Sequence, residues 1–297
     1  ALTKVPDPAA APIAASRLDD RKHQTRRSAA ILAGYVIPAS DQKAMRQFIR
    51  TVADESDQHA QNFGIISIGR LGGDDAVKWL VHALEKERHR ETRAFAALAL
   101  GIAKNTDSAP ALREAVATEK DETLRGAAAV ALGILGDRDS AETILKVLKE
   151  ERNPELRADL VTALGMLEFE GATEFVRELL GEARNRRLVQ ACGLFLAVVN
   201  DSSSIDLMLR VMRHSGSIQV KGGMATAIGR MADRRSIEEL VKLVKDGSET
   251  DQTRAFALVA LGLIADQADV SAFARISIDS NYALDDAQAL LEAIDIF

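Results

Sequence analysis

The stretch Arg125-Gly-Ala-Ala-Ala-Val-Ala-Leu-Gly-Ile-Leu-Gly-Asp137 recurs in variant form along the whole chain and decides its fold. A small residue marks each recurrence, at Gly34, Gly69, Gly101, Gly133, Gly165, Ala197, Gly229 and Gly262. Successive marks are 35, 32, 32, 32, 32, 32 and 33 residues apart. Such a fixed spacing is the signature of a repeat architecture, in which one structural unit is stacked many times.

Further columns keep the same register. The residue before each small position is apolar in all eight repeats. So is the residue eleven positions after it: Met45, Leu80, Leu112, Ile144, Val176, Met208, Leu240 and Phe273. Eight positions before the small residue stand mostly basic side chains: Arg26, Gln61, Arg93, Arg125, Arg157, Val189, Lys221 and Arg254. Each repeat therefore places the same kind of side chain at the same structural position.

Each repeat is predicted to contain two helices. Residues 140–149 carry their apolar residues on one face, which is the pattern of an amphipathic helix. Ser140 is a typical helix N-cap, and Ser236 with Glu239 has the spacing of a capping box. The second helix of the repeat is apolar nearly all round at residues 127–135, so it has to contact neighbours on several sides.

The repeats predict an all-α solenoid of about eight helical hairpins. The chain of 297 residues is rich in Ala and Leu, with 4% aromatic residues and 6 prolines, a composition that favours helices over sheets. A lone hairpin cannot bury its apolar face, whereas stacked hairpins form a continuous core. We expect a flexible Ala/Pro-rich leader over residues 1–19, a single solenoid over 20–297, and a capping helix at 283–297.

The pattern from Arg125 to Leu148 resembles the HEAT repeat superfamily, and within it the short HEAT-like repeat named after phycobilisome lyases. The resemblance implies a right-handed α-α superhelix with the first helices on the convex side and the second helices lining the concave side. It also implies that the arginine column and the acids near the turns form a ladder between adjacent repeats. Arg93, Arg125, Arg157 and Arg254 are therefore interpreted as structural.

Net charge, hydropathy and cysteine content limit the classes of partner that the sequence allows. A net charge of −6 argues against a grip on a phosphate backbone, so no nucleic acid is expected. No apolar run reaches the roughly 20 residues that a membrane span needs. Cys192 has no partner for an internal disulfide and lies in an apolar run, so it is predicted to be buried and inert. Oligomeric state stays open, and so does the compartment, either cytoplasmic or exported after signal-peptide removal.

Catalytic motifs are missing from the sequence. The five histidines include no pair at the helical i, i+4 spacing of a zinc site. The His-Glu dipeptides by which HEAT-like deoxyhypusine hydroxylases hold iron do not occur, nor does a nucleophile elbow or a phosphate-binding glycine loop. Basic clusters at residues 21–27, 88–93 and 184–187 are interpreted as solvated turn charges. We expect no catalytic residue, no metal and no cofactor.

One face of the second helices is a candidate binding surface. Positions two, five and nine after the arginine column share a helix face. They supply Phe63, Ile66, Arg70, Phe95, Leu98, Ile102, Val130, Ile134, Thr162, Met166 and Arg230, and Val198 continues the same face. If this face points into the concave groove, it is a docking site for a helix or an extended peptide. The alternative is that these side chains fill the seam between adjacent second helices.

The sequence favours a non-catalytic interaction scaffold that binds a protein or peptide on its concave face. The alternative is a bilin-lyase-like protein that holds a linear tetrapyrrole. That alternative rests on the resemblance of the repeat alone, and the candidate face offers few of the Arg, Tyr and His side chains that a tetrapyrrole would require. A third hypothesis is a regulatory module within a longer polypeptide.

Overall fold

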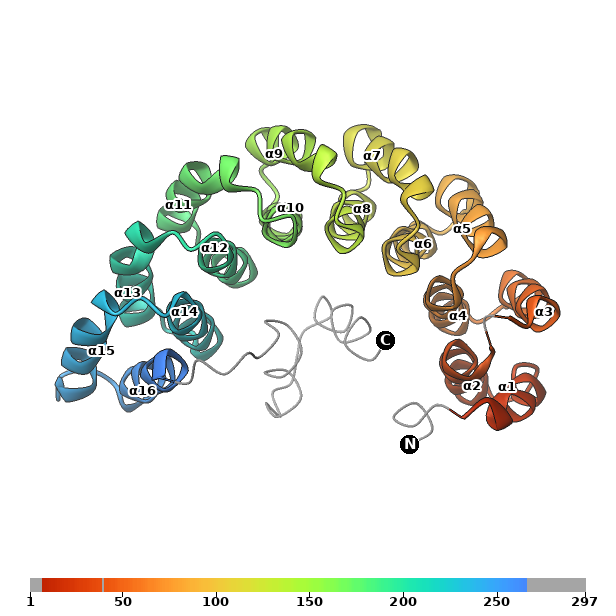
Figure 1. Cartoon of the computed structure of the whole chain (residues 1–297), viewed down its shortest axis with the longest axis horizontal. Coiled ribbons are helices and arrows are strands. Elements are labelled where there is room, and N and C mark those ends of the chain that lie inside the picture. The colour runs from red at the N-terminus through yellow and green to blue at the C-terminus, as the bar shows by residue number, and fades with distance from the viewer. Residues whose placement is uncertain (1–6, 39, 266–297) are drawn as a thin grey trace.

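The computed structural model describes residues 7–38 and 40–265, which fold into sixteen α-helices and five 3-10 helices with no strand among them. The helices pair into eight hairpins that stack along an arc (Figure 1). The outer helices are α1 (Ala11–Arg17), α3 (Gln42–Ala53), α5 (Asp74–Lys86), α7 (Ala109–Thr118), α9 (Ala141–Glu150), α11 (Thr173–Glu182), α13 (Ile205–His214) and α15 (Arg235–Lys245). The inner helices are α2 (His23–Val36), α4 (Gln58–Leu71), α6 (Arg90–Ala103), α8 (Glu122–Leu135), α10 (Pro154–Met166), α12 (Arg186–Val198), α14 (Ile218–Met231) and α16 (Asp251–Ala265).

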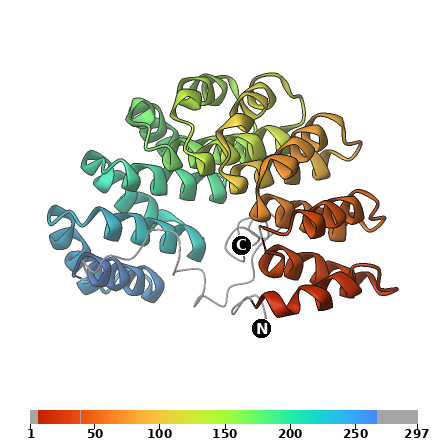
Figure 2. The same ribbon diagram turned by 45° about the vertical axis from the view of Figure 1, so that its right-hand side comes forward.

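The two layers of helices give the molecule a convex and a concave side (Figure 1). Odd-numbered helices line the outside of the arc and even-numbered helices line the inside, and the turned view in Figure 2 shows the same stacking of hairpins. Each inner helix packs against its own outer helix and against the inner helices before and after it. The predicted all-α solenoid of eight hairpins is confirmed.

The small-residue column sets the distance between inner helices. A Cβ at Gly69 would overlap the backbone carbonyl of Ala99 on α6, and a Cβ at Gly101 would lie 2.7 Å from the carbonyl oxygen of Ala131 on α8. Only glycine allows the backbones to approach this closely, which offsets its low helix propensity. As a result, α8 is buried along its whole length from Gly126 to Gly133.

The apolar column of the outer helices forms the other side of the core. Its seven members from Met45 to Leu240 are all at most 1% exposed, and they lie on the faces of α3 to α15 that meet the inner layer. The eighth member, Phe273, lies outside the described residues. The sequence register therefore identifies one fully buried anchor for each outer helix from α3 onward.

The flexible leader predicted over residues 1–19 is wrong for its second half. A 3-10 helix, η1 (Pro8–Ala10), leads into α1, and the side chains of Ala10 and Ala14 are buried against the first hairpin. Pro12 sits in the first turn of α1, where proline costs no hydrogen bond. The Ala/Pro composition thus encodes the first outer helix. The expected capping helix at 283–297 lies outside the described residues.

The serine caps predicted for the outer helices need correction. Ser140 ends the 3-10 helix η3 (Arg138–Ser140) and occupies the N-cap position of α9, but its hydroxyl donates to the carbonyl oxygen of Asp137 at 2.6 Å instead of capping. Ser236 lies inside α15 and donates to the carbonyl oxygen of Asp233 at 2.6 Å, so the capping box does not form. Both serines are buried, and they tie the 3-10 turn to the helix that follows.

Candidate partner-binding surface

The arginine column forms the predicted ladder between repeats at Arg26, Arg93 and Arg125, and Arg26 pairs with Glu55 of the next repeat at 2.8 Å. The Nε atom of Arg93 donates to the carbonyl oxygen of Leu84 at 2.6 Å, and its guanidinium pairs with Glu119 of the next repeat. Arg125 repeats the arrangement: Nε donates to the carbonyl oxygen of Val116 at 3.2 Å and Nη1 lies 3.4 Å from Glu151. These arginines fasten one hairpin to the next, so their structural interpretation is confirmed.

Two other members of the column depart from this pattern. Arg254 bonds the carbonyl oxygen of Val244 at 2.9 Å, but its acid is Asp251 of its own helix. The buried Nε of Arg157 has no hydrogen-bond partner, and the guanidinium lies 5.9 Å from the centroid of the Phe175 ring. The guanidinium also lacks the acid of the ladder, because Ala183 stands at the position that Glu151 occupies one repeat earlier.

The basic clusters are engaged in bonds between repeats. Arg27 pairs with Asp57 at 2.8 Å, which lowers the pKa of that carboxyl far below its usual value through the hydrogen bond from Arg27. Arg90 reaches Asp121 at 3.4 Å, and Arg187 pairs with Asp159 one repeat earlier. Each cluster thus has an arginine paired with an acid of an adjacent repeat.

Three predicted groove residues fill the seam between inner helices. Ile66, Leu98 and Val130 are 1%, 1% and 6% exposed. The close backbone approach set by the small-residue column brings the neighbouring helices over them, so their side chains are core. The expectation that these three line an exposed groove is corrected. Thr162 follows in the same row; it is half-buried and its hydroxyl donates to the carbonyl oxygen of Ala158 at 2.8 Å.

A second row, one residue after the small column, remains accessible. We call it the groove row, and it consists of Arg70, Ile102, Ile134, Met166, Val198 and Arg230. Arg70 is exposed and the other five are partly exposed. Adjacent packed helices lie about 8–10 Å apart, so the four apolar members span roughly 25–30 Å of the concave side. Arg70 lies at one end of the groove row. Its guanidinium stacks 3.9 Å from the ring centroid of Tyr35, which fixes the orientation of the Arg70 side chain.

The row two positions after the arginine column, nearer the start of the inner helices, contains both apolar and charged side chains. Phe63 and Phe95 are partly exposed on α4 and α6. At the same position α10 carries Asp159, whose carboxyl pKa is raised by burial against the opposing effect of Arg187. Apolar side chains therefore continue along the middle of the groove row, whereas in this row a charge follows the two phenylalanines.

Within the described residues, the cysteine is inaccessible and the potential metal ligands are scattered. Cys192 is buried within α12, and burial raises the pKa of its thiol to about 12. Among residues 7–38 and 40–265, no three His, Cys, Asp or Glu side chains lie close enough together to hold a metal ion. Over the same ranges, no helix has the length and apolar character needed to cross a membrane.

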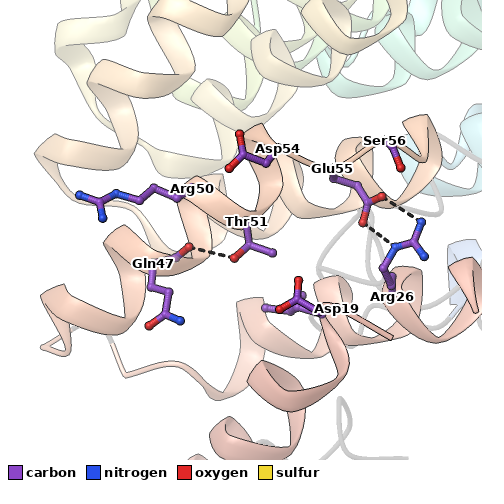
Figure 3. Close-up of a pocket in the computed structure, with 9 residues that line it drawn as sticks. Asp19, Arg26, Gln47, Arg50, Thr51, Asp54, Glu55 and Ser56 are labelled. Carbon is purple, nitrogen blue, oxygen red and sulfur yellow. Dashed lines mark hydrogen bonds and ion pairs between the residues drawn. The ribbon is translucent and has the colours of Figure 1, made fainter. Parts of the chain in front are cut away.

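A polar cleft between the first two hairpins was not anticipated from the sequence. It has a volume of about 330 Å³ and is lined by Leu18, Asp19, Arg26, Gln47, Arg50, Thr51, Asp54, Glu55 and Ser56 (Figure 3). Arg26 pairs with Glu55 at 2.8 Å on its wall, and the Thr51 hydroxyl donates to the backbone carbonyl of Gln47 at 3.1 Å within α3. The cleft lies where the outer helix α3 meets the first hairpin.

Comparisons with known proteins agree with this architecture. Residues 45–133 match the model of HEAT repeats, and residues 124–150 match the PBS lyase HEAT-like repeat. None of the curated proteins matches the sequence.

Two solved structures share the fold. A chain from the complex of CpcE and CpcF of phycocyanin lyase from Nostoc sp. PCC7120 superposes with a TM-score of 0.52 at 19% identity, covering 84% of this chain and 93% of that one. The Escherichia coli protein YibA superposes with a TM-score of 0.55 at 15% identity, covering 86% and 92%. At these identities the likeness concerns the fold alone. The chain therefore contains HEAT repeats over residues 45–133 and a PBS-lyase-type HEAT-like repeat over residues 124–150, within a solenoid of helical hairpins.

Proposed function

We propose that this protein is a non-catalytic scaffold that binds a protein or peptide partner along the groove row. The observation that carries the proposal is the row itself: four partly exposed apolar side chains at repeat spacing, with an arginine at each end. Contiguous apolar surface on a concave face is a typical site for docking another chain.

The spacing of the row limits the shape of its partner. Adjacent inner helices are about 8–10 Å apart, so successive apolar contacts repeat at that distance. A polyproline II segment rises about 3.1 Å per residue with three residues per turn, so every third side chain lies on one face at this interval. A helix rises about 1.5 Å per residue and matches it with a heptad spacing. We infer a partner segment with apolar residues at one of these two periods and acidic residues toward its ends, where Arg70 and Arg230 lie.

A bilin-binding, lyase-like role is the second candidate. The likeness to a chain of the phycocyanin lyase complex favours it, although that likeness concerns the fold alone. The same solved structure is a complex of two proteins, which equally favours a protein-binding role. The groove row argues against bilin, because its middle four members are apolar and cannot pair with the two propionates of a tetrapyrrole.

Substitution in the groove row tests the proposal. Peptides selected by the folded wild-type chain from a displayed random library would be measured against Ile134→Glu and Met166→Glu. Burying one such side chain is worth about 1.5–3 kcal/mol, so each variant is expected to weaken binding at least tenfold. Val81→Glu is the matched control, because Val81 is also partly exposed but lies on the outer helix α5.

Three outcomes would count against the proposal. The first is equal affinity of the selected peptides for wild type and both groove variants. The second is an equal loss of affinity in Val81→Glu. The third is an absorbance shift of an added bilin on mixing with wild type but not with Ile134→Glu, which would favour the lyase-like alternative. Leu98 and Val130 are unsuitable for this test, because a charge at either buried position would disrupt the core.

A further inference from the structure

The accessible part of the concave face is wider over α10, α12 and α14 than over α4, α6 and α8. In the row three residues before the small column, the side chains of the earlier three helices are buried; they are Ile66, Leu98 and Val130. The equivalent side chains of the later three helices are partly exposed; they are Thr162, Leu194 and Thr226. Each later helix therefore presents this residue together with the groove-row residue one turn further along.

The spacing of the inner helices explains this change. A Cβ at Gly69 or at Gly101 would lie 2.8 Å from the nearest Cα of the following inner helix. The same distance grows to 3.3 Å at Gly133 and to 3.6 Å at Gly165. The residue opposite Gly165 is Phe195, whereas α6, α8 and α10 carry alanine at that position. Because the phenylalanine needs more room, α12 stands farther from α10, and side chains at the edge of the contact become accessible.

These side chains form a strip that is two residues deep on three neighbouring helices of the concave side (Figure 1). We call it the anchor strip, and it consists of Thr162, Met166, Leu194, Val198, Thr226 and Arg230. Its two rows are about 5–6 Å apart, which suits the flank of a helix better than a single extended chain. Across three helices it measures about 16–20 Å, the length of about 11–13 helical residues.

Helices α12 and α14 carry basic and no acidic side chains, although the net charge of the chain is −6. The basic side chains are Arg186, Arg187, Lys221 and Arg230. Arg187 is paired with Asp159, and Lys221 is buried and donates to backbone carbonyls. Arg186 is exposed and Arg230 is partly exposed, and burial lowers the pKa of the Arg230 guanidinium. A partly desolvated cation gains more from a carboxylate than a fully hydrated one does.

The acids in the turns that follow these two helices are paired with arginines of the outer layer, Asp201 with Arg177 and Asp233 with Arg235. We propose that an acidic, amphipathic helix of a partner protein docks across α10, α12 and α14, with its apolar side on the anchor strip and its carboxylates toward Arg230 and Arg186. Complementary charge would orient such a helix on this surface. The inference rests on the proposed function and adds the position, the conformation and the charge of the partner segment.

Peptides selected by the folded full chain from a displayed random library test this inference. The selected sequences are expected to carry net negative charge and apolar residues at helical spacing, and to gain helical circular dichroism on binding. Thr226→Glu and Arg230→Glu should each weaken their binding at least about tenfold, because both place a negative charge against the carboxylates of the peptide. Val211→Glu is the matched control, because Val211 is also partly exposed but lies on the outer helix α13. Urea midpoints show that each variant is folded.

A charge exchange separates recognition from general damage to the surface. Peptides whose acidic residues are replaced by lysine should bind Arg230→Glu at least about tenfold more tightly than they bind wild type. Unchanged binding in both Thr226→Glu and Arg230→Glu would overturn the inference, as would selected peptides without net negative charge or an equal loss in Val211→Glu. A loss confined to Ile134→Glu, which lies outside the anchor strip, would overturn it while supporting the proposed function. Unchanged binding in every one of these variants and in Met166→Glu would overturn both.

Discussion

Replacing Ala183 with glutamate is expected to restore the missing rung of the arginine ladder and to stabilise the fold. Glu119 and Glu151 occupy the equivalent position in two earlier repeats, where they pair with Arg93 and Arg125. Ala183 ends its outer helix in the same extended conformation, with φ −62° and ψ 139°, as Glu151 with φ −78° and ψ 145°. A glutamate can therefore be placed there without backbone rearrangement.

The size of the gain follows from the contacts of Glu151. Its pair with Arg125 joins side chains that are 14% and 20% exposed, for which about 1 kcal/mol is a reasonable value. Its carboxylate also accepts the backbone N–H of Asn153 at 2.8 Å, worth about 1 kcal/mol, and Asn185 offers the same N–H beside position 183. A negative charge at the end of α11 opposes this by about 0.3–1 kcal/mol. The net expectation is about 1 kcal/mol of added stability.

Urea unfolding of wild type and four variants measures this gain and shows which contact supplies it. Ala183→Glu should raise the midpoint without changing the slope, and Ala183→Gln should raise it less because the amide carries no charge. In an Arg157→Met background the ionic part of the gain should disappear, leaving only the backbone hydrogen bond. An undiminished gain in that background would refute the reasoning, because it would show that Arg157 does not receive the new carboxylate.

Three further predictions concern packing and titration. Gly69→Ala should destabilise the fold by about 2 kcal/mol, because its Cβ would overlap Ala99. Gly181→Ala, with nothing within 4 Å, should add about 0.5–1 kcal/mol of helix stability, and urea midpoints distinguish the two. The Cys192 thiol, whose pKa burial raises to about 12, should stay unreactive toward an aromatic disulfide at about pH 8 until the chain unfolds, and prompt colour from folded protein would contradict this. Burial raises the pKa of Asp159, so the folded state binds that proton more tightly than the unfolded state, and this contribution to stability is lost as pH rises from about 4 through the folded pKa. The melting temperature of wild type should therefore fall over this pH range, and that of the Asp159→Asn variant should lack this fall.

The sequence predicts the number and order of hairpins because the small-residue column is a direct consequence of backbone contact between inner helices. It does not predict which side chains remain accessible. Helical periodicity gives the direction of Leu98 and Ile102, but their exposure depends on how closely the next helix approaches. The Ala/Pro composition around Ala14 also concealed α1, since alanine packs against a neighbouring helix as readily as it fills a leader. The missing acid partner of Arg157 was detectable from the alanine at position 183, but only with the partners of the other arginines in view.

Stability and recognition occupy different columns of the same repeat. The small column pulls adjacent inner helices together, and the row three residues before it is consequently buried at Ile66, Leu98 and Val130. The groove row lies one residue after the small column, at the edge of the helix contact, so its side chains are only partly covered. The residue type in the groove row varies between repeats, with Ile134 in one repeat and Met166 in the next, and the backbones still approach closely in both. The residues that fix the fold therefore carry little information about a partner, and under the proposed function the choice of partner would rest on a row that the fold tolerates in many forms.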